Sequence, residues 1–494
     1  MAFLILLFLL ISFNLHTAYA QSTTFPRLEP DPKALDYFNQ GRRNNGYSWI
    51  ELAEISLWTS GDSSAANLEK IRAAAEALNN SAELPVSAKE KAEFILSFLH
   101  RNILRSYSIY QTRVDTIFTN GRYNCVSSAV LYMIFCESAG IKTSGVITKD
   151  HALVTVHIDG EDIDVETTNR YGFDPGNRKD FHDQFGRLTG FTYVPAHNYR
   201  DRQTIGKIEL VSLILNNRIS DLERQNRYAD SVPLAIDRAA LLVGNALAVT
   251  QEAYSSESLF TDPRKELMDR LHNYGAWLLR ANREEDALRW ADAAYSKYPD
   301  PNRWQDFIFA AVNNRIARFI RENKVADARN FLESQKAVLT AANYTQLDIV
   351  VLDAELLRSA NQIRTAGEGN AALTAIAQAR DSGKIDERRA AELTTFAIQK
   401  TASVLSAAPA RDWRAAIRFI EASLERFGGN REAEQALRTY RNNLAVDYHN
   451  RFAAEWNKRN YEEAERILIE GLAEIPNDRQ LLVDMETVNK NRAR

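Results

Sequence analysis

The chain has 494 residues, a formal net charge of −4, and apolar and charged fractions of 45% and 26%. This length is expected to provide two or three folded units, each large enough to bury a core. The near-neutral balance gives no support for nucleic acid as a partner, and no basic run or stacking motif favours one.

The first twenty residues form an apolar block that ends in Ala18-Tyr19-Ala20. A small-residue site of this kind after an apolar stretch is typical of a secretory signal, although no Lys or Arg lies near the start. No later apolar run reaches the length needed to span a bilayer. We therefore expect residues 1–20 to be a signal peptide, and the mature protein to be secreted or periplasmic without a transmembrane segment.

Four segments that follow this block carry apolar residues at helical spacing. A break that contains Pro85 separates the last two of them. We expect these helices to pack around the next feature of the chain as an amino-terminal lobe. The segments are Lys33–Asn39, Ile50–Thr59, Ser64–Leu78 and Ala88–Leu104.

A cysteine stands at the expected start of the next helix. Asn124 is suited to be its N-cap, Cys125 is its first residue, and Ala139-Gly140 marks its end. The helix dipole and the unpaired amides of the first turn favour a thiolate at this position. Cys125 is therefore a candidate nucleophile; the alternative is a small residue of the core.

Beyond the helix the apolar pattern changes from helical to alternating. Residues 141–147 and 151–158 are expected to form strands, with Asp159-Gly160 as a two-residue hairpin turn that returns the chain through residues 161–168. The second strand begins at His151, which is 26 residues after the cysteine.

The register of this hairpin selects a carboxylate for the histidine. With a two-residue turn, Glu166 becomes the diagonal neighbour of His151 on the same face, about 7 to 8 Å away. Asp164 would pair with Thr155, two steps further from the histidine. A three-residue loop would exchange the faces and favour Asp164 instead. We therefore prefer Glu166 as the residue that orients the imidazole.

The order and spacing of these residues resemble the transglutaminase-like superfamily of cysteine peptidases and acyltransferases, over roughly residues 90 to 205. The resemblance implies an α+β, papain-like fold with an antiparallel sheet, and a nucleophilic cysteine, a histidine and a carboxylate as catalytic residues. Glu166 stands where the family usually has aspartate, and no aromatic residue follows His151-Ala152. The matching runs are Asn124-Cys125, Asp150-His151-Ala152 and Val165-Glu166-Thr167-Thr168.

Other cysteine sites fit the spacing less well. Papain-type enzymes place their histidine about 130 to 150 residues after the cysteine. A zinc site needs more soft ligands than two cysteines 11 residues apart, without a Cys-x-x-Cys pair. Cys136 lies about 16 Å along the same helix from Cys125, so no disulfide can join them. We expect no metal, no cofactor and a packing role for Cys136.

Residues 169–202 are rich in glycine, proline and aromatic residues and are expected to form an irregular segment beside the site. Its aromatic residues Tyr171, Phe173 and Tyr193 either line a substrate groove or anchor the segment itself.

From about Ile208 onward the chain is rich in alanine, leucine and arginine and has almost no strand signal. Four residues between 271 and 299 match the 34-residue tetratricopeptide pattern, and the second-helix half recurs near Ala416, Ala464 and, more weakly, Ala328. Small residues are needed where paired helices cross closely. The spacings are irregular, so a nonrepeating helical bundle is the alternative. The four matching residues are Gly275, Ala287, Ala294 and Pro299.

These features predict an α+β transglutaminase-like domain in residues 21–205, followed by an all-α tetratricopeptide-like domain in residues 206–494 that binds a protein or peptide. In this interpretation the Cys125 thiolate attacks a carboxamide or peptide carbonyl, His151 moves the proton, and Glu166 orients the imidazole. The Cys125 amide supplies part of the oxyanion hole, with Gln111 or Tyr110 as candidate second donors.

The sequence leaves the acceptor and the activity open. Water as acceptor makes the protein a peptidase or amidase, and an amine makes it an acyltransferase. The contrasting hypothesis is an interaction or scaffold protein whose transglutaminase-like module is noncatalytic and whose helical repeats do the binding.

Overall fold

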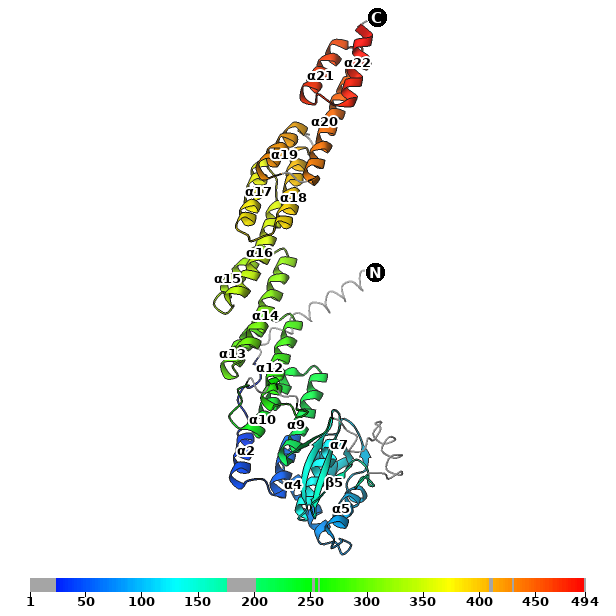
Figure 1. Cartoon of the computed structure of the whole chain (residues 1–494), viewed down its shortest axis with the longest axis vertical. Helices are drawn as coiled ribbons and strands as arrows, with labels where there is room; N and C mark the ends of the chain where they lie inside the picture. Colours follow the sequence, from blue (N-terminus) through cyan, green and yellow to red (C-terminus); the bar gives the residue numbers. More distant parts are fainter. Residues whose placement is uncertain are drawn as a thin grey trace, which may run out of the picture. The chain divides into compact units, whose positions relative to one another are not determined.

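The computed structural model describes residues 24–175, 201–250, 254–255, 258–407, 412–428 and 431–492. The expected signal peptide, residues 1–20, and Tyr193 lie outside this part of the chain. The protein is mainly helical and contains one four-stranded antiparallel sheet among its described residues (Figure 1). It divides into two compact units between Phe307 and Ile308. None of the described helices is long and apolar enough to cross a membrane.

The first unit begins with helices, continues through the sheet and returns to helices. Helix α14, Pro301–Arg321, contains the division between the two units. The elements before it are α2 (Pro32–Asn44), α3 (Trp49–Ser60), α4 (Ala65–Asn79), α5 (Ala88–Asn102), β1 (Ser106–Tyr107), α6 (Val114–Asn120), β2 (Arg122–Tyr123), α7 (Cys125–Ser138), β3 (Lys142–Ile147), β4 (Ala152–Ile158), β5 (Glu161–Val165), β6 (Gln203–Ile205), α9 (Lys207–Arg224), α10 (Tyr228–Val243), α12 (Pro263–Arg280) and α13 (Glu284–Lys297).

The four-stranded sheet has the order β5-β4-β3-β6. Asp159 and Gly160 form the turn between β4 and β5, both with positive φ (51° and 86°), as a tight two-residue hairpin requires. Ile158 pairs with Glu161, and the pairing continues as far as Val154 with Val165. The predicted two-residue hairpin and its register are therefore confirmed as far as Val165, whereas the expected continuation of the strand through residue 168 is wrong because the pairing ends there.

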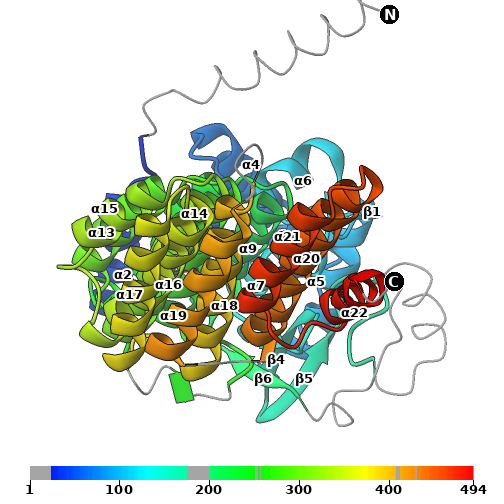
Figure 2. The ribbon, with the colours of Figure 1, turned by 90° about the horizontal axis from the view of Figure 1, so that it is seen from above.

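Helix α7 is the centre of the first core. Every residue from Val126 to Cys136 is buried, as expected for a helix that is apolar on all sides. Helices α3, α4, α5 and α9 contact it, and it lies against β3 and β4. Figure 2 shows the ribbon from above, with strands β4, β5 and β6 gathered at the lower edge of the view. Three of the four expected amino-terminal helices thus surround the cysteine helix. The fourth, α2, packs mainly against α10, so its expected place beside α7 is wrong.

Helix α9 belongs to the same core as the cysteine helix. Its residues Leu210, Val211 and Ile214 are fully buried in the cluster that contains α7. Strand β6, which directly precedes α9, pairs with β3 and brings the chain back to the sheet. The first compact unit therefore extends beyond residue 205, where we expected the helical repeat domain to begin.

The second unit consists of helices joined by short connections, and successive helices pack against each other (Figure 1). Ala328, Ala416 and Ala464 are fully buried, and Gly471 lies so close to Tyr448 that an added Cβ would be 2.9 Å from its ring. The small residues found in the sequence therefore lie at points of close packing. The helices are α15 (Val325–Ser334), α16 (Ala341–Asn361), α17 (Ala366–Asp381), α18 (Glu387–Leu405), α19 (Trp413–Phe427), α20 (Arg431–Asn457), α21 (Tyr461–Glu474) and α22 (Arg479–Arg492).

Candidate active site

Cys125 is the first residue of α7 and is partly exposed, whereas the next eleven residues are buried. The side chain of Asn124 accepts a hydrogen bond from the Ser127 amide (3.0 Å), and the Ser127 hydroxyl accepts one from the Asn124 amide (3.0 Å). This reciprocal capping box fixes the start of the helix. The cysteine therefore lies at the positive end of the helix dipole, beside amides that have no partner within the helix.

His151 lies beside Glu166 at the end of the hairpin. Its Nε2 is 2.6 Å from Oε2 of Glu166, and the two side chains are 8% and 1% exposed. The other carboxylate oxygen, Oε1, accepts hydrogen bonds from the amide (3.1 Å) and the hydroxyl (2.7 Å) of Thr168. Both oxygens of Glu166 are thus held, and one of them is fixed on the imidazole.

The imidazole also reaches the thiol. The charge of the Cys125 sulfur acts on the imidazole, and because Nε2 is bonded to Glu166, Nδ1 is the nitrogen left to face the thiol. Burial opposes the charged imidazole, but the Glu166 carboxylate and the nearby Cys125 sulfur outweigh it and raise the pKa of His151 well above its usual range. The arrangement therefore favours an imidazolium between a sulfur and a carboxylate.

A tight loop after β5 brings Glu166 into place. The Glu166 amide donates to the Gly172 carbonyl (2.8 Å), and the Gly172 amide donates to the Asn169 carbonyl (2.9 Å). A Cβ added to Gly172 would lie 1.9 Å from the Glu166 carbonyl oxygen, so only glycine allows the chain to pass so close. The carboxylate position therefore depends on a contact six residues away.

Asp164, the alternative carboxylate, is directed elsewhere. It accepts a hydrogen bond from the Thr155 hydroxyl (2.8 Å) and a bidentate pair from the Arg202 guanidinium (2.5 and 2.6 Å). The structure thus brings Cys125, His151 and Glu166 together, with Asp164 bound to other partners.

The candidate oxyanion donors from the sequence are not directed at the thiol. The Gln111 amide donates to the Thr116 hydroxyl and to the Arg113 carbonyl. Tyr110 is 65% exposed and stacks with the Arg224 guanidinium.

Of the aromatic residues expected beside the site, Phe173 is buried (1% exposed) and bridges to Val165, so it belongs to the core and does not line a groove. Tyr171 is 40% exposed. Cys136 is fully buried, and burial raises the pKa of its thiol. Within the described ranges no cluster of three His, Cys, Asp or Glu residues is placed to hold a metal ion.

A cluster of aromatic rings near the thiol, formed by His100, Tyr107 and Tyr123, was not predicted from the sequence. Tyr107 contacts Tyr123 edge to face with ring centroids 6.1 Å apart, and His100 contacts the same Tyr123 at 5.7 Å. The Tyr107 ring lies close enough to Cys125 and Glu166 for their charges to act on its hydroxyl. The parallel pairing of the two-residue strands β1 and β2 creates this contact, and such short strands leave no periodic signal in a sequence.

Comparison with known proteins gives no assignment. No protein-family model matches the chain, and no curated protein sequence is significantly similar to it. The function is therefore argued from the geometry of the site.

Proposed function

We propose that the protein is an exported thiol enzyme of the transglutaminase-like type that acts on amide or peptide bonds through Cys125, His151 and Glu166. The observation that carries this proposal is a partly exposed thiol at a helix start, close to a buried imidazole that is bonded to a buried carboxylate. Burying a charged pair of this kind is costly for stability, and residues with strongly shifted pKa values cluster at functional sites.

The reaction begins when the thiolate sulfur attacks the substrate carbonyl carbon. A carbon–sulfur bond forms, and the electron pair of the carbonyl moves to its oxygen. As the tetrahedral intermediate collapses, the carbon–nitrogen bond breaks, and the leaving amine takes the proton from Nδ1 of His151. A thioester remains on Cys125, and the imidazole is now neutral.

The second half of the reaction uses the same groups in reverse. Neutral His151 removes a proton from water or from an acceptor amine, which then attacks the thioester and releases the thiolate. Glu166 keeps the proton of Nε2 in place throughout, so that Nδ1 always faces the sulfur. Water gives hydrolysis, and an amine gives acyl transfer.

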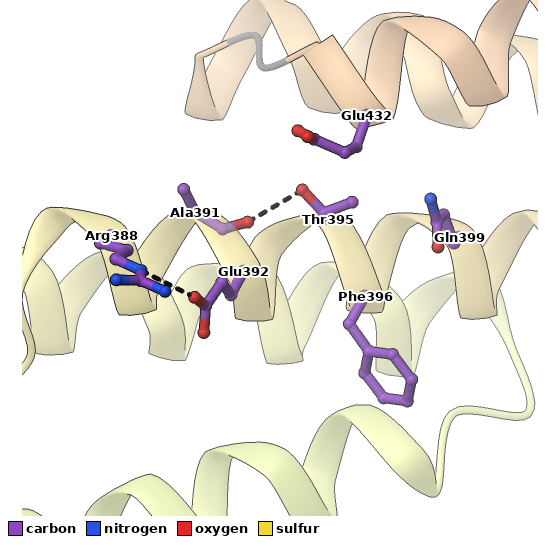
Figure 3. Close-up of a pocket in the computed structure, with 7 residues that line it drawn as sticks. All are labelled: Arg388, Ala391, Glu392, Thr395, Phe396, Gln399 and Glu432. Carbon is purple, nitrogen blue, oxygen red and sulfur yellow. Dashed lines mark hydrogen bonds and ion pairs between the residues drawn. The ribbon is translucent and has the colours of Figure 1, made fainter.

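The helical array provides a second candidate function, binding of a protein or peptide by tetratricopeptide-like helix pairs. A cavity of about 450 Å³ lies on α18 and reaches the first turn of α20 (Figure 3). Figure 3 shows Thr395 and Gln399 on the α18 side that faces Glu432, with Phe396 directed to the other side. This cavity is the observation that favours an interaction protein.

Labelling with iodoacetamide at pH 6, where an ordinary thiol reacts slowly, separates the two functions. We expect the wild type to be alkylated once and Cys125→Ser to remain unmodified. Cys136→Ser is the matched control and should be alkylated like the wild type, because Cys136 is fully buried. Labelling that follows Cys136, or a wild type that reacts only at alkaline pH, would leave the interaction protein as the better interpretation.

A further inference from the structure

We propose that the Tyr107 hydroxyl is the second oxyanion donor of the site, acting together with the backbone amide of Cys125. This assignment rests on the proposed thiol chemistry, which needs two hydrogen-bond donors where the carbonyl oxygen becomes negative.

The segment that carries Tyr107 is bound to Tyr123 and to the start of α7 by three hydrogen bonds. The Ser108 amide donates to the Tyr123 carbonyl (2.8 Å). The side-chain amide of Asn124 donates to the Ile109 carbonyl (3.2 Å), and the Ser127 hydroxyl donates to the Gln111 carbonyl (2.9 Å). These bonds fix the residues just after Tyr107 to the same turn that presents the thiol.

Strand pairing then places Tyr107 itself. It lies opposite Tyr123 in the parallel β1-β2 pair. Tyr123 in turn comes two residues before Cys125 in the chain. The two rings meet edge to face at an angle of 81°, which fixes the plane of the Tyr107 ring. Tyr107 is half-buried and packs against the first core, so its ring is held by contacts on more than one side.

The hydroxyl of Tyr107 remains available for a ligand. Among the described residues no hydrogen bond engages it, whereas the neighbouring Tyr123 hydroxyl donates to the Thr168 carbonyl (3.1 Å). Gln111 is occupied by its own turn, and Tyr110 is solvent-exposed. Of these three side chains, Tyr107 is thus the donor near the thiol that is not already in use within the described part of the chain.

The phenol also has the protonation state that a donor needs. Burial, together with the charges of Cys125 and Glu166, raises the pKa of Tyr107 well above its usual range. The hydroxyl therefore keeps its proton at every pH at which the thiolate is active. It donates a hydrogen bond to the oxyanion and transfers no proton, because the leaving amine takes its proton from His151.

The test compares two reactions of the same thiolate in the full-length protein. Alkylation by iodoacetamide displaces iodide and creates no oxyanion. Acetylation by p-nitrophenyl acetate passes through a tetrahedral oxyanion and releases p-nitrophenolate. We expect Tyr107→Phe to retain the wild-type alkylation rate and to lose about 10- to 100-fold in acetylation rate, toward the lower end of losses seen when a donor is removed.

Tyr123→Phe is the matched control, because its hydroxyl is bound to the Thr168 carbonyl and not directed to a substrate. It should change both rates by the same factor. An equal loss of both rates in Tyr107→Phe would show that Tyr107 only supports the site, and no loss in either would remove it from the oxyanion hole. A wild type without alkylation at pH 6 would instead overturn the proposed function and this assignment with it.

Discussion

Replacing Glu166 with glutamine tests the carboxylate that holds the imidazole. Thr168 donates from both its amide and its hydroxyl to Oε1, so an oxygen has to stay at this position. The glutamine carbonyl will therefore face Thr168, and its NH₂ group will face Nε2 of His151. An NH₂ group only donates, so Nε2 has to become an acceptor and the single ring proton moves to Nδ1. That tautomer cannot take a proton from Cys125.

The size of the effect follows from the bond that is lost. A hydrogen bond between charged groups contributes about 1.5–3 kcal/mol, and each 1.4 kcal/mol corresponds to a tenfold change in population. We therefore expect Glu166→Gln to lower the rate of Cys125 alkylation at pH 6 by about 10- to 100-fold. The second-order rate constant for iodoacetamide, followed by intact mass, measures this directly.

Asp164→Asn is the control for this substitution. Asp164 lies on the hairpin but binds Arg202 and Thr155, so the asparagine variant should be alkylated at a rate close to that of the wild type. A larger loss in Asp164→Asn than in Glu166→Gln would refute the reasoning. It would mean that the carboxylate two residues earlier, and not Glu166, controls the protonation of the imidazole.

Two further predictions concern the same site. Gly172→Ala should reduce alkylation at pH 6, because the added Cβ would lie 1.9 Å from a carbonyl oxygen of the loop and displace the carboxylate at His151; unchanged alkylation would mean that the loop absorbs the methyl group. Histidine-labelled ¹⁵N NMR should show His151 still protonated at pH 7.5, because Glu166 raises its pKa despite burial. His100 should still be neutral at pH 5, because burial lowers its pKa to about 4. Reversed titrations would contradict the assigned ion pair.

The features that the sequence predicted well are those set by neighbouring residues. The start of α7 depends on Asn124, and its end on Gly140, which has a φ of 77° after the last turn. The hairpin depends on Asp159-Gly160, whose positive φ angles fix a two-residue turn and with it the register of β4 and β5. Each of these is a local conformational preference, and each places a site residue.

Features that depend on distant contacts could not be predicted in this way. Phe173 is an aromatic residue of the kind that lines grooves, yet it is bridged to Val165 and buried in the first core. Helix α9 has the same amphipathic pattern as the helices that follow, and only its packing on α7 shows that it completes the first core. Tyr107 is placed near the thiol by a strand of only two residues. In all three, the amino-acid pattern allows several partners, and the tertiary structure selects one.

The glutamate at position 166 illustrates how local conformational preferences and tertiary contacts combine. The register of the hairpin puts position 166 diagonal to His151, at a separation where a longer side chain is an advantage. The paired strand ends at Val165, and the loop closed by Gly172 then turns the chain so that the carboxylate meets Nε2 and Thr168 at once. An aspartate at the same backbone position would be one methylene shorter and could not keep both contacts. A glutamate where the transglutaminase-like family usually has aspartate is therefore compatible with the loop geometry and with the proposed thiol site.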